Sequence, residues 1–192
     1  ELHIIISDNG SGLFENIKSK LDLSTIQLAA LEIAKGQVTS NPFDYSGEAL
    51  NTIFHLFDRV KIDSSGFGII YNSNNNHWEI NYSKQKQGTR VHLQINPNSN
   101  RTCDKTFQKL FKKQKQSFRI PLILLKEPNK KSLHSKLHAK SIFWNINYLK
   151  EIKFDFYHID LIGPAFADEL VRQSRSINRD VIIGWVNYIN TV

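Results

Sequence analysis

The sequence contains one cysteine, Cys103, and no methionine among its 192 residues. A single cysteine cannot form a disulfide within the chain, so the sequence predicts a protein of a reducing compartment. No apolar run approaches the roughly 20 residues that a bilayer crossing requires. The first residues do not resemble a signal peptide either, because no charged segment precedes an apolar one. We therefore expect a cytoplasmic protein with no membrane partner.

Acidic residues are scarce in only one part of the chain. The formal net charge is +7, but residues 101–153 hold 14 Lys and Arg against 3 Asp and Glu. The segments on either side, 1–100 and 154–192, each carry a net charge of −2. The basic segment raises the hypothesis of nucleic-acid binding. Affinity of the whole chain for nucleic acid does not follow from it. The hydrophobic fraction of 40% excludes a disordered chain.

The first half of the sequence has the pattern of an α/β sandwich. Leu2 to Ile6 is typical of a short buried strand, and it ends in a polar turn at residues 8–12. Apolar residues then recur at helical spacing, and Lys35-Gly36 provides a helix stop. We predict helices over 13–21, from 23 to 36 and over 48–57, a loop over 37–47, and strands over 67–71, 77–82 and 88–95.

The second half alternates strands with helices, which predicts βαβ units and a mostly parallel sheet. The predicted order is a strand over 120–125, a helix over 137–149, a strand over 152–156, a helix over 164–175 and a strand over 181–186. A turn at Asn96–Asn100 marks the expected boundary. We therefore predict a first domain over 1–97, a basic linker over 98–117 and a second domain over 118–192.

Three short patterns in the first domain are candidates for ligand binding. The run Asp8-x-Gly-x-Gly12 follows a strand, and a carboxylate there can accept the exocyclic amine of an adenine. Its glycines let the backbone approach a ligand closely. Gly47 begins a helix, where free backbone N–H groups favour a phosphate. Gly88-Thr89 opens a late strand. The first two also have structural interpretations: a tight turn with Asp8 capping the next helix, and a helix cap at Gly47.

In this order, the three patterns resemble the GHKL ATP-binding fold of histidine kinases, anti-sigma-factor kinases and gyrase. The resemblance covers residues 1–95, and the run Lys35 to Glu48 narrows it to a bacterial subfamily in which a small STAS-like domain follows the ATPase-like domain. It implies that the chain binds ATP and that Gly47 faces the phosphates. The other implied roles are adenine recognition by Asp8, a pocket shaped by Gly10 and Gly12, and support of the adenine side by Thr89. Ala49 replaces the second glycine of the usual phosphate turn.

The second domain resembles a bacterial STAS-like family of unassigned function. The similarity lies in the run Phe154 to Leu170 and in the preceding segment Ser135 to Phe143. Phosphorylatable antagonists of anti-sigma factors carry a serine at the strand-to-helix turn, whereas this chain has Gly163-Pro164-Ala165. The resemblance implies a protein-interaction module. Alternatively, Phe166 and Leu170 pack the core, and Asp168 and Glu169 complement the helix dipole.

The GHKL resemblance also implies a helix before Leu2 that carries a Mg²⁺-binding asparagine and an acidic general base. The sequence starts inside an apolar run and without methionine, so we expect a fragment or processed chain. As given, it has no candidate catalytic or metal-binding residue, and we expect it not to hydrolyse ATP.

We therefore expect a bacterial signalling protein that switches with nucleotide, through closure of the segment 36–47, and binds a protein partner through its STAS-like domain. One alternative is a nucleic-acid-associated regulator that uses residues 101–153. The other is an active ATPase or protein kinase when the upstream helix is present.

Other residues give weaker indications. His134 and His138 are spaced to share a helix face, but no third metal ligand accompanies them. Cys103 lacks a histidine partner nearby, which argues against a nucleophile. Three tryptophans fall in predicted elements and are expected in the core: Trp78, Trp144 and Trp185.

Overall fold

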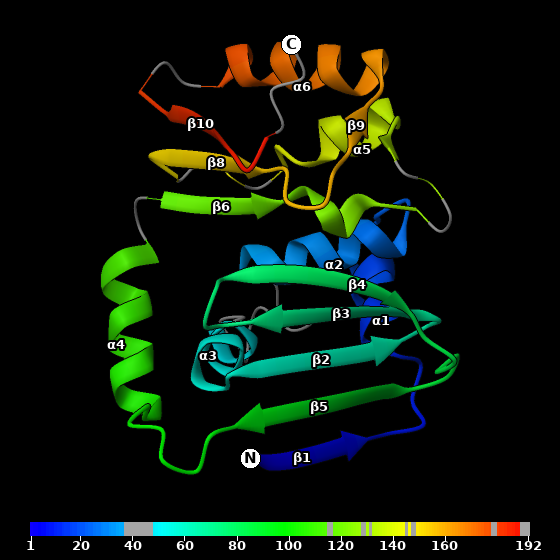
Figure 1. Ribbon diagram of the computed structural model, residues 1–192. Helices are drawn as coiled ribbons and strands as arrows, with labels where there is room; N and C mark the ends of the chain where they lie inside the picture. The colour runs from blue at the N-terminus through cyan, green and yellow to red at the C-terminus, as the bar shows by residue number, and fades with distance from the viewer. Residues whose placement is uncertain are drawn as a thin grey trace. The chain divides into compact units, whose positions relative to one another are not determined.

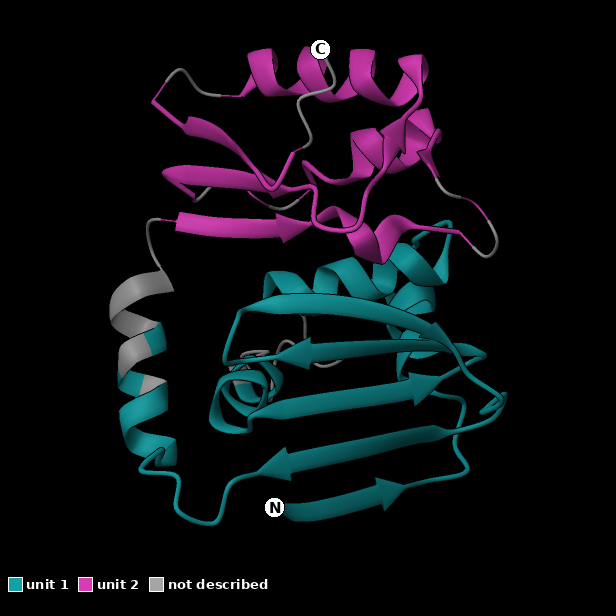
Figure 2. Ribbon diagram, viewed as in Figure 1, with its two compact units in different colours: residues 1–110 teal, residues 111–192 magenta. Residues whose placement is uncertain are grey.

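The computed structural model describes residues 1–36, 48–114, 117–127, 130, 132–144, 146, 149–177 and 180–188. The chain divides into two units, Glu1–Leu110 and Phe111–Val192 (Figure 2). The division falls within residues 98–117, where a linker is predicted, and helix α4 (Cys103–Gln114) occupies most of that segment. Among the described residues, no helix combines the length and hydropathy needed to cross a membrane.

The first unit is built on a five-stranded antiparallel sheet, with the strand order β1-β5-β2-β3-β4. Three helices lie against one face of this sheet (Figure 1). The elements are β1 (Leu2–Ser7), α1 (Leu13–Lys20), α2 (Ile26–Lys35), α3 (Glu48–Leu56), β2 (Arg59–Ser64), β3 (Phe67–Asn72), β4 (His77–Tyr82) and β5 (Thr89–Ile95).

The core of the first unit lies between the sheet and these helices. Val60, Ile62 and Ile69 of the sheet are almost fully buried, as are Phe14 of α1 and Phe54 of α3. The aromatic rings of Phe54, Tyr71 and Trp78 pack together with centroids 4.7–5.7 Å apart. The predicted place of Trp78 in the core is therefore confirmed.

Strand β2 was not predicted from the sequence, although it is the middle strand of the sheet. Val60 and Ile62 are the two apolar residues of the strand, and the charged residues Arg59, Lys61 and Asp63 alternate with them. Two apolar residues in a short charged run give a weak periodic signal, so nonlocal pairing with β3 and β5 decides this strand.

The predicted burial of the first strand is wrong. All six residues of β1 are exposed, and Ile5 and Ile6 show 63% and 60% of their surface. In the described part of the chain, β1 is an edge strand whose one pairing partner is β5. A run of β-branched residues indicates a strand, but its position in the sheet decides how much of it is covered.

The second unit contains a three-stranded parallel sheet with the order β10-β8-β6, which confirms the predicted parallel arrangement. A separate pair, β7 and β9, is also parallel. The elements are β6 (Ser117–Pro121), the 3₁₀ helix η1 (Leu122–Leu125), β7 (Ser132–Leu133), α5 (Lys136–Ser141), β8 (Glu151–Asp155), β9 (Leu161–Ile162), α6 (Pro164–Ser176) and β10 (Ile182–Val186).

Two predicted elements of this unit differ in extent. The strand expected over 120–125 ends at Pro121 and continues as η1, whose four residues are buried. A continuous apolar run does not distinguish a strand from a buried helical turn. The helix expected over 137–149 ends at Ser141. Ile142, Ile146 and Leu149 are nevertheless buried, so their helical spacing marked burial and not a continuous helix.

Candidate functional site

Asp8 lies directly after β1, beside the start of β5. Its Oδ1 atom accepts hydrogen bonds from the backbone N–H of Gly10 at 2.7 Å and of Thr89 at 3.3 Å. Its own backbone N–H donates to the carbonyl of Thr89 at 2.9 Å. The carboxylate is exposed, and its second oxygen accepts no hydrogen bond from any described residue. One oxygen therefore orients the group while the other stays available for a ligand.

Two glycines hold the turns at Asp8 and before β5 against each other. The N–H of Gly88 donates to the carbonyl of Gly10 at 2.8 Å. Gly88 has a φ of +70°, and a Cβ atom there would lie 2.0 Å from the carbonyl oxygen of Asp8. No side chain fits into this contact. Gly88 therefore allows the two backbones to approach closely enough for the Asp8–Thr89 hydrogen bonds.

Gly12 precedes α1 as its N-cap residue, with a φ of +92°. A Cβ atom there would lie 2.6 Å from the hydroxyl oxygen of Ser64 and 2.7 Å from that of Ser65. The Ser64 hydroxyl also donates to the carbonyl of Gly88 at 3.0 Å. The end of β2 therefore supports both glycine turns. Sequence reasoning missed these two serines, because it assigned no element between residues 58 and 66.

Thr89 joins the Asp8 turn to helix α1. Besides its two backbone hydrogen bonds to Asp8, its hydroxyl oxygen accepts the N–H of Leu13 at 2.9 Å. That N–H belongs to the first residue of α1, whose N-cap supplies no side-chain acceptor. The Thr89 hydroxyl therefore accepts the hydrogen bond of a helix N–H group that a capping side chain would otherwise accept.

The structure thus brings together four of the five residues predicted to bind the nucleotide: Asp8, Gly10, Gly12 and Thr89. The fifth, Gly47, and all but Gly36 of the segment 36–47 that was predicted to close lie outside the described residues. The alternative role of Asp8 as the cap of α1 is wrong, because Gly12 is the N-cap. The tight turn that the same alternative included is present.

In the second unit, the strand-to-helix turn is closely packed. Gly163 is the N-cap of α6, and its N–H donates to the carbonyl of Leu133 at 2.7 Å. A Cβ atom on Gly163 would lie 2.1 Å from Nδ1 of His134. Phe166 and Leu170 are buried, as the structural alternative for this helix predicted. The turn therefore packs its glycine against an imidazole.

Glu169 of α6 is buried among hydrogen-bond donors instead of facing solvent. Its carboxylate accepts hydrogen bonds from Arg172 at 3.0 Å through Nε and from Gln173 at 2.7 Å, and Lys136 of α5 lies 3.8 Å away. The hydrogen bonds from Arg172 and then from Gln173 lower the pKa of Glu169 from 4.5 to about 2. The carboxylate therefore stays ionised in the folded protein over most of the acidic range.

This depressed pKa predicts an acid-dependent loss of stability. A carboxyl group with a lower pKa in the folded state stabilises the fold above its unfolded pKa, and that contribution is lost as the pH falls toward the folded pKa. The free energy of unfolding of the wild type should exceed that of Glu169→Gln by a constant amount above about pH 5. The difference should shrink between pH 4.5 and about 2. Urea unfolding across this range measures it, and a pH-independent difference would contradict the assignment.

The two histidines that were weak metal-site candidates differ in their exposure. His134 precedes α5 and is exposed, whereas His138 is buried within it, and burial lowers the pKa of His138. No group of three or more potential metal ligands occurs in the described part of the chain. The predicted core positions of Trp144 and Trp185 are wrong, because 44% and 40% of their surfaces are exposed.

Many cations of the basic segment 101–153 have carboxylate partners. Arg101 pairs with Asp58 at 2.8 Å, and Arg119 pairs with the buried Asp155 at 2.8 Å. Three lysines also form ion pairs, namely Lys130 with Glu127, Lys136 with Glu169, and Lys153 with Glu151. The local charge of the sequence is therefore partly neutralised within the fold.

Comparison with known proteins adds no family name. No family model matches the chain, and no curated protein matches it. The functional conclusion therefore depends on the geometry of the site and on the resemblance in its motifs.

Proposed function

We propose that the first unit binds an adenine nucleotide and that Asp8 recognises the adenine. The observation that carries the proposal is the state of the Asp8 carboxylate. Two backbone N–H groups hold one oxygen, while the other is exposed and accepts no hydrogen bond from the described residues. A fixed acceptor at a glycine turn suits the exocyclic amine of a flat base, because the glycines keep side chains out of its way.

The same geometry discriminates between the two purines. The exocyclic group that adenine directs at this acceptor is an amine, which donates a hydrogen bond. Guanine has a carbonyl oxygen at the same position, and two acceptors facing each other repel. A site built around a hydrogen-bonding carboxylate is therefore expected to bind ATP and to reject GTP.

The way in which the phosphates of the nucleotide would bind is proposed from the sequence. Gly47 would face the phosphates, with Ala49 restricting how closely the backbone approaches them. Among the described residues, no group of three or more acidic, histidine or cysteine side chains could hold Mg²⁺. We accordingly propose binding and derive no hydrolytic step.

For the whole chain, we propose a signalling role in which the nucleotide state of the first unit changes what the STAS-like second unit binds. A nucleotide can shift such an equilibrium only if it binds the two states differently. Nucleic-acid binding through residues 101–153 is the less favoured candidate, because five cations of this segment already pair with carboxylates.

The direct test is calorimetric titration of ATP into the wild type and into Asp8→Asn. The amide can still accept one hydrogen bond, but it removes the charge and offers a donor that repels the adenine amine. Hydrogen bonds to charged groups contribute roughly 1.5–3 kcal/mol, so we expect an affinity about 10- to 100-fold weaker. GTP should not bind the wild type, because its carbonyl oxygen would face the Asp8 carboxylate.

Asp104→Asn is the matched control. Asp104 is an exposed acid in the first turn of α4, which follows the far end of β5 from Thr89. This variant loses the same charge but should bind ATP like the wild type. Equal ATP affinity of the wild type and Asp8→Asn would exclude Asp8 as the adenine acceptor.

A further inference from the structure

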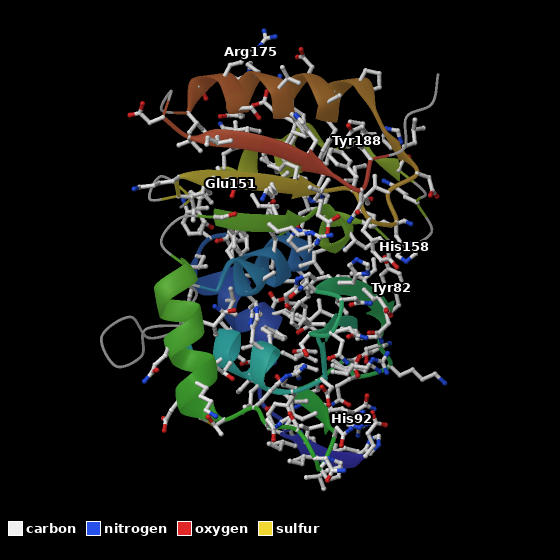
Figure 3. The ribbon with its side chains drawn as sticks, turned by 60° about the vertical axis from the view of Figure 1, so that its left-hand side comes forward. Tyr82, His92, Glu151, His158, Arg175 and Tyr188 are labelled. Carbon is white, nitrogen blue, oxygen red and sulfur yellow. The ribbon has the colours of Figure 1, made fainter. Side chains whose placement is uncertain are left out.

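An apolar pocket lies at the carboxyl ends of two parallel strands of the second unit. Its volume is about 390 Å³, and its lining residues come from the segments that follow β8, from β9 and from the end of β10. Figure 3 shows Glu151, which starts β8, at one end of this sheet, and His158 and Tyr188 at the other end. Ligands of parallel α/β sheets bind outside the carboxyl ends of the strands.

A buried carboxylate fixes the rim of this pocket. Asp155, the last residue of β8, accepts hydrogen bonds from Nε of Arg119 at 2.8 Å, from the N–H of Tyr157 at 3.0 Å and from Nδ2 of Asn187 at 2.8 Å. The N–H of Phe156 also donates to the carbonyl of Val186 at 3.0 Å. These hydrogen bonds within the protein hold the segments after β8 and β10 together and fix the shape of the rim.

Aromatic and aliphatic side chains form the walls of the pocket in equal number among its described lining residues. Phe156, Trp185 and Tyr188 line it, and the rings of Phe156 and Trp185 lie 5.9 Å apart. Trp185 and Tyr188 remain 40% and 56% exposed. Large aromatic side chains that line a preformed pocket and stay accessible present π-electron faces to an incoming ligand.

Charge selects the class of ligand. Among the described residues that line the pocket, Asp160 is the only charged one. It is exposed, and it forms no hydrogen bond or ion pair with the described residues. An anion would meet this carboxylate, and none of the described lining residues is a cation that could offset it. A cation with an apolar surface would meet both the carboxylate and the negative faces of the aromatic rings.

We infer that this pocket binds a small alkylammonium ion, with its charged head over Trp185 and beside Asp160. The quaternary ammonium group fits this chemistry best, because it combines a positive charge with apolar methyl groups and needs no hydrogen-bond acceptor. This binding site goes beyond the nucleotide site proposed for the first unit, and neither depends on the other.

Choline is the probe, and its neutral analogue with a tert-butyl group in place of the trimethylammonium group is the comparison. Heteronuclear NMR of the whole chain follows the three tryptophan indole N–H signals. We expect choline to shift the Trp185 signal in a saturable manner and to leave those of Trp78 and Trp144 unchanged. The neutral analogue should bind at least about fivefold more weakly. Equal affinity for the two compounds, or no shift with choline, would overturn the inference.

Two pairs of variants test which side chains contribute to the affinity for choline. Trp185→Leu keeps an apolar wall but removes the π face, so the choline affinity should fall about fivefold or more. Trp144→Leu changes an equally exposed tryptophan outside the pocket and should leave it unchanged. Asp160→Asn should weaken binding about threefold at low salt, and less at high salt, whereas Asp168→Asn should not. If both members of a pair behaved alike, the ligand would not sit where the structure assigns it.

Discussion

Replacing Gly88 with alanine should lower the free energy of unfolding of the first unit by about 4 kcal/mol or more, a value reserved for severe local conflicts. The added Cβ would lie 2.0 Å from the carbonyl oxygen of Asp8 and 2.9 Å from Cα of Asn9, and both are backbone atoms. No rotation of a side chain relieves these contacts, so the turns must separate. Because Gly88 joins the two turns, Gly88→Ala should also abolish ATP binding. Urea unfolding followed by circular dichroism measures the first effect.

Gly66→Ala is the matched control for this substitution. Gly66 has a φ of +78°, close to the +70° of Gly88, but among the described residues beyond its two chain neighbours no atom lies within 4 Å of the Cβ that alanine would add. Only the conformational cost of a left-handed residue applies, roughly 1–2 kcal/mol. The loss of unfolding free energy in Gly88→Ala beyond that in Gly66→Ala therefore measures the cost of separating the two closely packed backbones. Equal losses in the two variants would show that this close packing is unimportant.

The second large effect is expected at a buried ion pair in helix α2. Glu32 and Lys35 lie one turn apart, their side chains are each only 2% exposed, and Nζ of Lys35 lies 2.5 Å from Oε1 of Glu32. Burial raises the pKa of Glu32 and lowers the pKa of Lys35, despite their mutual attraction. Lys35→Met would leave Glu32 buried without this cation. We expect the free energy of unfolding at neutral pH, measured by urea unfolding, to fall by about 3–5 kcal/mol.

The pH dependence of this variant identifies the cause. A carboxyl group with a raised pKa in the folded state destabilises the fold when it ionises, and its protonated form is tolerated. The deficit of Lys35→Met should therefore be smallest near the unfolded pKa of 4.5 and grow as the pH rises through the folded value. Replacing both residues, as Glu32→Leu with Lys35→Met, should recover most of the stability. A pH-independent deficit would point to lost packing instead.

Much of the secondary structure could be predicted because its signals are local. Helix α2 ends before Gly36, which adopts the left-handed conformation, as the sequence indicated. It begins at Ile26, after the capping residue Thr25, and not at the predicted residue 23. The alternating apolar residues of β5 were equally plain. Strand β2 and the early end of α5 were not predicted, since the first depends on partners far along the chain and the second on how a buried apolar run packs.

The residues of the candidate nucleotide site could be predicted from the sequence, but the contacts that hold them together could not. Spacing and residue type pointed to Asp8, Gly10, Gly12 and Thr89. That Gly88 meets the backbone of Asp8, and that Ser64 supports both turns, depends on residues up to 80 positions apart meeting across the sheet. No local pattern contains that information.

The alkylammonium pocket was even less accessible to sequence reasoning. Trp185 lies in a predicted strand, where tryptophan is usually buried, and Asp160 belonged to no motif. Their proximity follows from the parallel alignment of β8 and β10, which brings the segments after both strands to the same end of the sheet.

The sequence by itself determined the α/β class, the parallel character of the second unit and the glycine turns beside Asp8, because side-chain periodicity and backbone freedom are properties of short segments. Only the tertiary structure decided which residues are covered: β1 is exposed despite its apolar run, and Glu32 and Lys35 are buried despite their charge. Burial is decided by what packs against a segment, and that partner lies elsewhere in the chain.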